Sequence, residues 1–260
     1  MMRNAETMLR RRYDRHDWES IGDGYSGATV YRLTGPSALF VKLAPWPVGP
    51  DTGGDPTAEA DRLRWLAANG VPAPEPWDAG VIGDTAFLVS AGLPGRSAAE
   101  PWPEPVRAAV VDAVADFAVW LHSLPVDGCP FTRDVPVILA QSSEAVARDD
   151  SGDRRAVLDR TATLAAGLTE GAEALCHGDF CLPNVLLDPD SLAVTGVVDV
   201  GRFGRSDPYA DLALVTRSLA DHRLNPQYGP EYARRFLRRY GADPVDSDRI
   251  DLFRSLDALL

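Results

Sequence analysis

The sequence predicts an α+β protein of two lobes: a small N-terminal lobe of antiparallel β-sheet with one helix, then a larger, mainly helical lobe. The first 92 residues contain short apolar strands separated by glycine-rich turns, whereas apolar residues recur at helical spacing from residue 104 onward. A loop and a short hairpin interrupt the helical part at residues 176–199. We therefore expect one lobe at residues 1–92 and a second at residues 93–260, with a flexible proline- and glycine-rich crossing at residues 45–56.

The N-terminal lobe begins with a glycine-rich turn. Gly22, Gly24 and Gly27 form a G-x-G-x-x-G pattern just before a strand-forming run at residues 29–31. Glycines let a backbone approach phosphate groups closely, because no Cβ stands in the way. A dinucleotide-binding fold would need a helix directly after the glycines, but strand-forming residues follow instead. The pattern therefore predicts a β-hairpin over the phosphates of a nucleotide.

Two apolar strands follow in this lobe. The strand at residues 38–43 carries a single lysine, Lys42. A strand lysine can simply face solvent, but its position after a glycine-rich hairpin favours contact with the α- and β-phosphates of ATP. The strand at residues 87–91 runs into Gly92 and Pro94, which suits a hinge between the lobes.

The one helix expected in this lobe covers residues 57–69. Thr57 is its predicted N-cap, and Gly70 stands where the helix stops. Glu59 lies in the first turn, where any helix favours an acidic residue. We expect Glu59 to pair with Lys42 and so hold the ammonium on the phosphates.

Helical periodicity dominates the second lobe. Apolar residues between Glu104 and Leu124 recur at helical spacing, which predicts a buried helix whose aromatic residues belong to the core. His122 on this helix is expected to pack or cap rather than to act as a base. Further helices are expected at residues 154–168, 209–221, 230–240 with Gly241 as the stop, and 247–260.

The loop at residues 177–184 reads H-G-D-x-x-x-x-N, and the hairpin after it ends at Asp199. The loop alone is weak support for chemistry, since such residues are common in turns, but the order of loop, hairpin and second aspartate is specific. Phosphoryl transfer needs a protein to orient a nucleophile and to place cations against the phosphoryl oxygens. Asp179 is therefore expected to take the proton of an acceptor hydroxyl. Asn184 and Asp199 offer the hard oxygen ligands that Mg²⁺ prefers.

These motifs, in this order, resemble the protein-kinase-like fold and, within it, the aminoglycoside O-phosphotransferases, a family of antibiotic kinases. The resemblance implies transfer of the γ-phosphate of ATP or GTP, with Mg²⁺, to a hydroxyl of an aminoglycoside-type antibiotic, which inactivates the drug and confers resistance. It rests on residues 176–179, 182–184, 194–202 and 210–214, and extends to 59–66, 121–125 and 129–130.

The resemblance also implies roles for single residues. It gives Asp179, Asn184, Asp199, Lys42 and Glu59 the roles already described. It further places Tyr25 and Ser26 over the phosphates, and Ser90 and Ala91 of the hinge beside the adenine. It places Arg202 at the border of the acceptor pocket. Asp211 is expected to anchor the backbone of the loop at residues 177–184, called the catalytic loop below.

The C-terminal tail departs from the family pattern. Many aminoglycoside kinases of this type end in Leu-Asp-Glu and two aromatic residues, and the carboxylates bind substrate amines. This chain ends Leu256-Asp257-Ala258-Leu259-Leu260, so one carboxylate is missing. Asp257 is a candidate contact for an amine, although a carboxylate in a terminal helix is often only solvated. The segment at residues 130–175, expected to line the acceptor, is also shorter than the family pattern.

Other functions stay open for this reason. A kinase of a nucleoside antibiotic, a cyclic peptide antibiotic or a metabolite is the main alternative. A binding-only pseudokinase would have lost its chemistry, yet the base, both metal ligands, the lysine and its acidic partner are all present. A protein kinase is disfavoured, because the segment between Asp199 and Asp211 is too short for a long activation segment.

Composition limits the partners. The net charge of −12 is opposite to what nucleic-acid binding requires and would attract a cationic small molecule. Three cysteines show neither zinc spacing nor an even disulfide set, which indicates a reducing compartment. The first 13 residues are charged, and no apolar run approaches membrane-spanning length. We expect a cytoplasmic monomer or weak dimer with no nucleic-acid or membrane partner.

Overall fold

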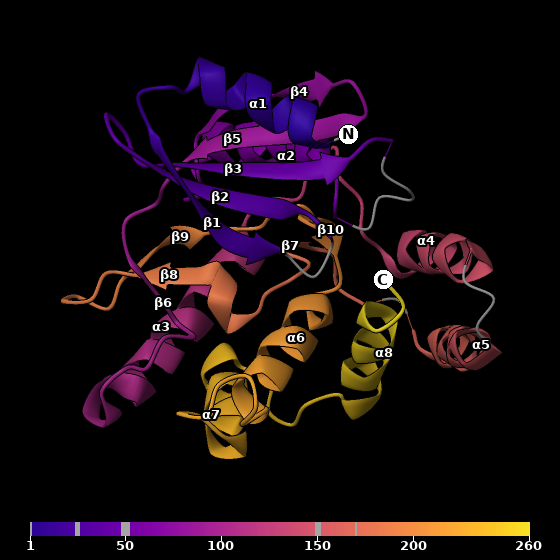
Figure 1. Cartoon of the computed structure of the whole chain (residues 1–260). Helices are drawn as coiled ribbons and strands as arrows, with labels where there is room; N and C mark the ends of the chain where they lie inside the picture. Colours follow the sequence, from indigo (N-terminus) through magenta and orange to yellow (C-terminus); the bar gives the residue numbers. More distant parts are fainter. Residues whose placement is uncertain (1, 24–26, 48–52, 149–151, 170) are drawn as a thin grey trace. The chain divides into compact units, whose positions relative to one another are not determined.

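The computed structural model describes residues 2–23, 27–47, 53–148, 152–169 and 171–260 (Figure 1). The chain divides into two compact units. The N-terminal unit comprises residues 1–93 together with 199–201, and the C-terminal unit comprises residues 94–198 and 202–260.

The N-terminal unit contains a five-stranded antiparallel sheet with the strand order β1-β2-β3-β5-β4. Alternating apolar residues on β3 and β5, including Val41 and Val89, are fully buried in its core. Because these residues alternate along β3, Lys42 points to the other face of the sheet. The strands are β1 (Asp17–Asp23), β2 (Thr29–Thr34), β3 (Leu39–Pro45), β4 (Pro76–Ile82) and β5 (Thr85–Ala91).

Two helices accompany this sheet among the described residues, where the sequence predicted one. The additional helix, α1 (Met2–Arg12), buries only Ala5 and Leu9, so its apolar pattern is too short to stand out. The expected helix, α2, spans Pro56–Ala68. Its N-cap is Asp55 rather than Thr57: the carboxylate accepts a hydrogen bond from the Thr57 backbone N–H, and proline occupies the first helical position.

The C-terminal unit is mainly helical, with two small sheets. Its helices are α3 (Glu104–Ser123), α4 (Val135–Arg148), α5 (Gly152–Gly167), α6 (Tyr209–Ala220), α7 (Pro230–Tyr240) and α8 (Ser247–Asp257). One sheet has the order β6-β8-β9, and the other pairs β7 with β10. Their strands are β6 (Arg96–Ser97), β7 (Ala174–Cys176), β8 (Val185–Leu187), β9 (Val194–Val197) and β10 (Gly204–Ser206).

Helix α6 is mostly buried and packs against α7 and α8 (Figure 1). Nine of its twelve residues are buried, including Asp211, Thr216 and Ser218. A buried polar side chain must find a partner. Those of Asp211 and Ser218 reach the catalytic loop, as described below, whereas the Thr216 hydroxyl donates to backbone carbonyls of α6 itself. Helix α6 therefore forms the support on which this loop rests.

Most predicted elements of the C-terminal unit are present, with two corrections. Helix α4 was not predicted. Trp120 on α3 was expected in the core but is 37% exposed, while Phe117 on the same helix is buried. Within the described parts of the chain, no helix is long and apolar enough to cross a membrane.

Candidate active site

Lys42 lies between two carboxylates of the N-terminal unit. Its Nζ is 2.8 Å from Oε2 of Glu59 on α2 and 2.7 Å from Oδ1 of Asp199. Burial opposes the charge of this ammonium, but Glu59 and Asp199 outweigh burial and raise its pKa well above the ordinary value. The expected ion pair with Glu59 is thus present, and Lys42 keeps a fixed positive charge.

Asp199 has an unusual backbone conformation. Its φ is 57°, in the left-handed region that non-glycine residues rarely adopt. Such a conformation costs on the order of 1–3 kcal/mol and is typical of functional sites. Two residues later, Gly201 approaches the Gly53 carbonyl so closely that a Cβ would lie 2.2 Å from its oxygen. The short segment at residues 199–201 therefore lies close against the chain just before α2. The Asp199 side chain remains 50% exposed.

The predicted hinge residues Ser90 and Ala91 end strand β5. The Ala91 N–H donates to the Glu75 carbonyl at 2.8 Å, and the next N–H, of Gly92, donates to the Ala38 carbonyl at 2.8 Å. A nucleotide base beside this segment would therefore use its other backbone groups. Tyr25 and Ser26, predicted over the phosphates, lie outside the described residues.

The catalytic loop of the C-terminal unit is anchored through its backbone. Both carboxylate oxygens of buried Asp211 are used: Oδ2 accepts from the His177 N–H and Oδ1 from the Gly178 N–H, each at 2.8 Å. Ser218, two turns further along α6, accepts from the Leu182 N–H at 3.2 Å. The backbone role expected for Asp211 is therefore confirmed.

Gly178 is required by the same geometry. Its φ is 79°, and a Cβ at this position would lie 2.2 Å from the Arg202 carbonyl oxygen. Any side chain here would displace the loop or the turn that contains Arg202. His122 contacts the Asp211 carboxylate, with Nε2 3.1 Å from Oδ2. Its other ring nitrogen, Nδ1, is 2.8 Å from the Tyr240 hydroxyl. It is a packed imidazole, as expected.

The Asp179 carboxylate is held at both oxygens. Nδ2 of Asn184 lies 3.2 Å from Oδ2, and the Cys181 thiol donates to Oδ1 at 3.4 Å. Burial and the neighbouring Asp179 raise the pKa of Cys181 well above its ordinary value, so the thiol is protonated at neutral pH. Asp179 as a residue is only partly buried.

Asn184 can offer its amide oxygen to a cation. Both side-chain hydrogen bonds found for it in the described structure are donated by Nδ2, to the backbone oxygen and Oδ2 of Asp179. The amide oxygen accepts no hydrogen bond in the described structure. An amide oxygen and a half-exposed carboxylate, that of Asp199, are donors of the kind Mg²⁺ prefers, so both residues fit the predicted metal roles.

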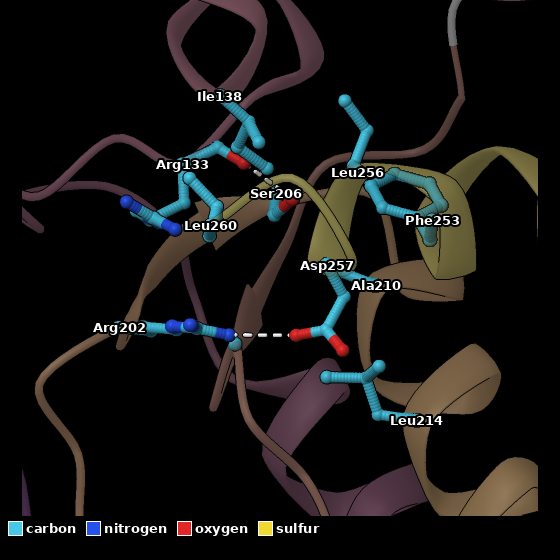
Figure 2. Close-up of a pocket in the computed structure, with 11 residues that line it drawn as sticks. Arg133, Ile138, Arg202, Ser206, Ala210, Leu214, Phe253, Leu256, Asp257 and Leu260 are labelled. Carbon is cyan, nitrogen blue, oxygen red and sulfur yellow. Dashed lines mark hydrogen bonds and ion pairs between the residues drawn. The ribbon is translucent and has the colours of Figure 1, made fainter. Parts of the chain in front are cut away.

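Arg202 and Asp257 meet in a small pocket of the C-terminal unit (Figure 2). Arg202 Nη1 is 2.7 Å from Asp257 Oδ1, and Arg217 Nη2 is 2.7 Å from Asp257 Oδ2. The Asp257 side chain is only 17% exposed, so it is not simply solvated. Arg133 also lines the pocket, and most of the other lining residues, including Ile138, Leu214, Phe253 and Leu256, are apolar.

The family model described as "Phosphotransferase enzyme family" matches residues 17–253, almost the whole chain. The chain belongs to this family. An aminoglycoside 3'-phosphotransferase of Streptomyces fradiae is 42% identical over 97% of this chain and 98% of its own length. This similarity confirms the resemblance inferred from the motifs.

Solved structures agree with this assignment. A crystal structure of an aminoglycoside-3'-phosphotransferase of type VIII matches this phosphotransferase with a TM-score of 0.88 and 38% identity, over 100% of this chain and 99% of that one. An aminoglycoside phosphotransferase APH(3'')-Id of Streptomyces rimosus, in complex with ADP and streptomycin, matches with a TM-score of 0.77 and 31% identity, over 99% and 98% of the two chains. The predicted fold class is confirmed.

The phosphotransferase brings the predicted residues together in three groups. Lys42, Glu59 and Asp199 form one in the N-terminal unit; Asp179 with Asn184, and Arg202 with Asp257, form two in the C-terminal unit. The sequence reasoning missed Cys181 and Arg217. Cys181 stands two residues after Asp179, a spacing that lets a short side chain reach back in a loop. No local signal in the sequence links Arg217 to Asp257.

Proposed function

We propose that this phosphotransferase moves the γ-phosphate of ATP or GTP to a hydroxyl group of an aminoglycoside antibiotic and thereby inactivates it. The observation that carries this proposal is the Asp179 carboxylate, which Cys181 and Asn184 orient on a loop whose backbone Asp211 fixes. A fixed and accessible carboxylate can take the proton of an attacking hydroxyl. The 42% identity to an aminoglycoside 3'-phosphotransferase supports the choice of acceptor.

The nucleotide would be held by the N-terminal unit. The fixed charge of Lys42 suits the α- and β-phosphates, and Glu59 keeps the ammonium in place. Tyr25 and Ser26 would cover the phosphates, and the backbone around Ser90 and Ala91 would meet the adenine. The relative that was solved with ADP supports a nucleotide as the donor.

Asn184 and Asp199 would hold Mg²⁺ through one amide oxygen and one carboxylate. When bound, the ion neutralises charge on the phosphate oxygens. Nζ of Lys42 is 2.7 Å from Oδ1 of Asp199, so Lys42 would hold this carboxylate in place while the ion is bound. Asp179, hydrogen-bonded to Asn184, keeps the proton-accepting group next to a metal ligand.

The acceptor would bind beside Arg202 and Asp257. An amine of an aminoglycoside can pair with the Asp257 carboxylate, and the acidic protein attracts such a cation. The two arginines already paired with Asp257 favour a second acceptor class, hydroxylated compounds that carry fewer amines, such as nucleoside antibiotics. We place the enzyme in the cytoplasm as a monomer or weak dimer.

A panel of acceptors tests this proposal. Purified protein is incubated with Mg²⁺ and ATP plus an aminoglycoside, a nucleoside antibiotic or no acceptor, and ADP release is measured together with the mass of the acceptor. Aminoglycosides should stimulate ADP release and gain one phosphate. If only the nucleoside antibiotics were phosphorylated, the acceptor class would be nucleoside antibiotics and not aminoglycosides. No acceptor-dependent ADP release at all would refute the proposal.

A further inference from the structure

The Cys181 thiol interacts with two charged groups of the C-terminal unit. It donates to Asp179 Oδ1 at 3.4 Å. The positive charge of the Arg217 guanidinium also acts on it. The backbone fixes the thiol as well, because the Cys181 N–H donates to the Asp179 carbonyl at 2.8 Å and the Cys181 carbonyl accepts from the Asn184 N–H at 3.0 Å.

We infer that Cys181 is a positioning residue for phosphoryl transfer: its S–H group fixes the rotation of the Asp179 carboxylate, the proton acceptor. This inference rests on the function proposed above. It assigns Cys181 no contact with the substrate, and it requires that the residue act through Asp179.

The reason lies in the torsion that ends an aspartate side chain. The rotation about its Cβ–Cγ bond is broad, so the backbone alone does not set the plane of the carboxylate. Two donors that bond to different oxygens do set this plane. Here Asn184 donates to Oδ2 and Cys181 donates to Oδ1. The position of a catalytic group strongly affects the reaction rate, since a displacement of about 1 Å can lower the rate on the order of 10²-fold.

The positive charge of Arg217 acts on the same thiol. A positive charge attracts the sulfur end of the S–H dipole, which agrees with an S–H hydrogen that is donated to Asp179. Arg217 also pairs with Asp257 Oδ2 at 2.7 Å.

Two variants of Cys181 test this inference. Cys181→Ala removes the donor and should lower kcat about tenfold while KM for ATP stays within about twofold. Cys181→Ser keeps a donor at the same position and should retain kcat within about threefold of the wild type. Cys129→Ala is the matched control, because it removes another buried thiol of the same unit, one that donates to the Phe131 carbonyl, and it should leave kcat unchanged.

A double-mutant cycle separates positioning from a general structural effect. In the Asp179→Asn background, Cys181→Ala should change the residual rate by less than about twofold, since the group on which it acts is gone. A loss as large as in the wild-type background would overturn the inference. Normal kcat in Cys181→Ala, or an equal loss in the alanine and serine variants, would overturn it as well.

A crystal structure of Cys181→Ala gives a readout that does not depend on activity. The Asp179 carboxylate should be rotated or should occupy more than one orientation; an unchanged single orientation would contradict the inference. Failure of the proposed function has a different signature, because the wild-type protein would then release no acceptor-dependent ADP and Asp179→Asn would behave like the wild type.

Discussion

Lys42 and Glu59 form an ion pair that is withdrawn from solvent, with Nζ and Oε2 2.8 Å apart and side chains 15% and 6% exposed. A buried ion pair is weak support for stability, because desolvation offsets most of its attraction. Its value here is geometric. Glu59 leaves the long lysine side chain few orientations, so the ammonium stays where strand β3 and helix α2 place it.

Glu59→Gln should therefore lower kcat/KM for ATP by about tenfold or more, because the ammonium loses the carboxylate that we propose holds it on the phosphates. KM for the acceptor should change little. Asp61→Asn, on the same helix at an exposed position, is the matched control. Steady-state kinetics with ATP as the varied substrate provide the measurement; equal kcat/KM values in both variants would show that the pair does not position Lys42.

Asp211→Asn should destabilise the protein by about 3 kcal/mol or more, since hydrogen bonds to a charged acceptor contribute about 1.5–3 kcal/mol each. An amide offers only one acceptor oxygen, so one of the backbone N–H groups of His177 and Gly178 would face an NH₂ group instead. Urea unfolding measures this loss, with Asp190→Asn in an exposed turn as the control. A loss below about 1 kcal/mol would mean that the loop does not depend on this anchor.

Local sequence patterns predict much of this fold. The helices that were predicted correctly and those that were not differ for physical reasons. Helices α3, α6 and α7 have long apolar faces or clear stop signals such as Gly241, whose φ of 95° suits glycine. Helix α1 was missed because only Ala5 and Leu9 face the core. The cap of α2 was misplaced by two residues because Asp55 and Thr57 are both good caps, and only Pro56 separates the alternatives.

The candidate site divides in the same way. The loop motif predicts Asp179 and Asn184 because their roles depend on a fixed short spacing. The pairing of Asp257 with Arg217 could not be predicted, since the two residues lie on different helices and meet only through tertiary packing. The link from Cys181 to Asp179 depends on the rotation of two side chains, which spacing does not determine.

Asp199→Ala should raise the Mg²⁺ concentration needed for half-maximal rate by about tenfold or more, because one of the two proposed protein ligands is lost. KM for the acceptor should remain close to the wild-type value. A magnesium titration at saturating ATP provides the measurement, with Asp190→Ala as an exposed carboxylate control. An unchanged magnesium dependence would show that Asp199 is not a ligand of the metal ion.

Tyr228 gives a prediction at alkaline pH. Burial raises the pKa of its phenol to about 12, and its hydroxyl donates to the Ala98 carbonyl at 3.0 Å. Tyr228→Phe should cost about 1 kcal/mol near pH 7 through the lost hydrogen bond. The raised pKa means that the neutral phenol stabilises the fold fully below an unfolded pKa of about 10 and loses this effect as the pH rises toward 12.

The stability difference between the wild type and Tyr228→Phe should therefore narrow between about pH 10 and pH 12. Urea unfolding across this range measures it. Tyr232→Phe serves as a control, because this ring packs edge-on against Tyr228 at 5.2 Å. A pH-independent difference would show that the phenol of Tyr228 titrates alike in the folded and unfolded chains.

The rate of acceptor phosphorylation by Asp179→Asn tests the central claim most directly. Asparagine keeps the shape of the side chain but cannot take a proton, so kcat should fall by about 10²-fold or more, with KM for ATP within about twofold of the wild type. A kcat within about threefold of the wild type would contradict the account, because the carboxylate held by Cys181 and Asn184 would then not be the group that receives the proton of the acceptor hydroxyl.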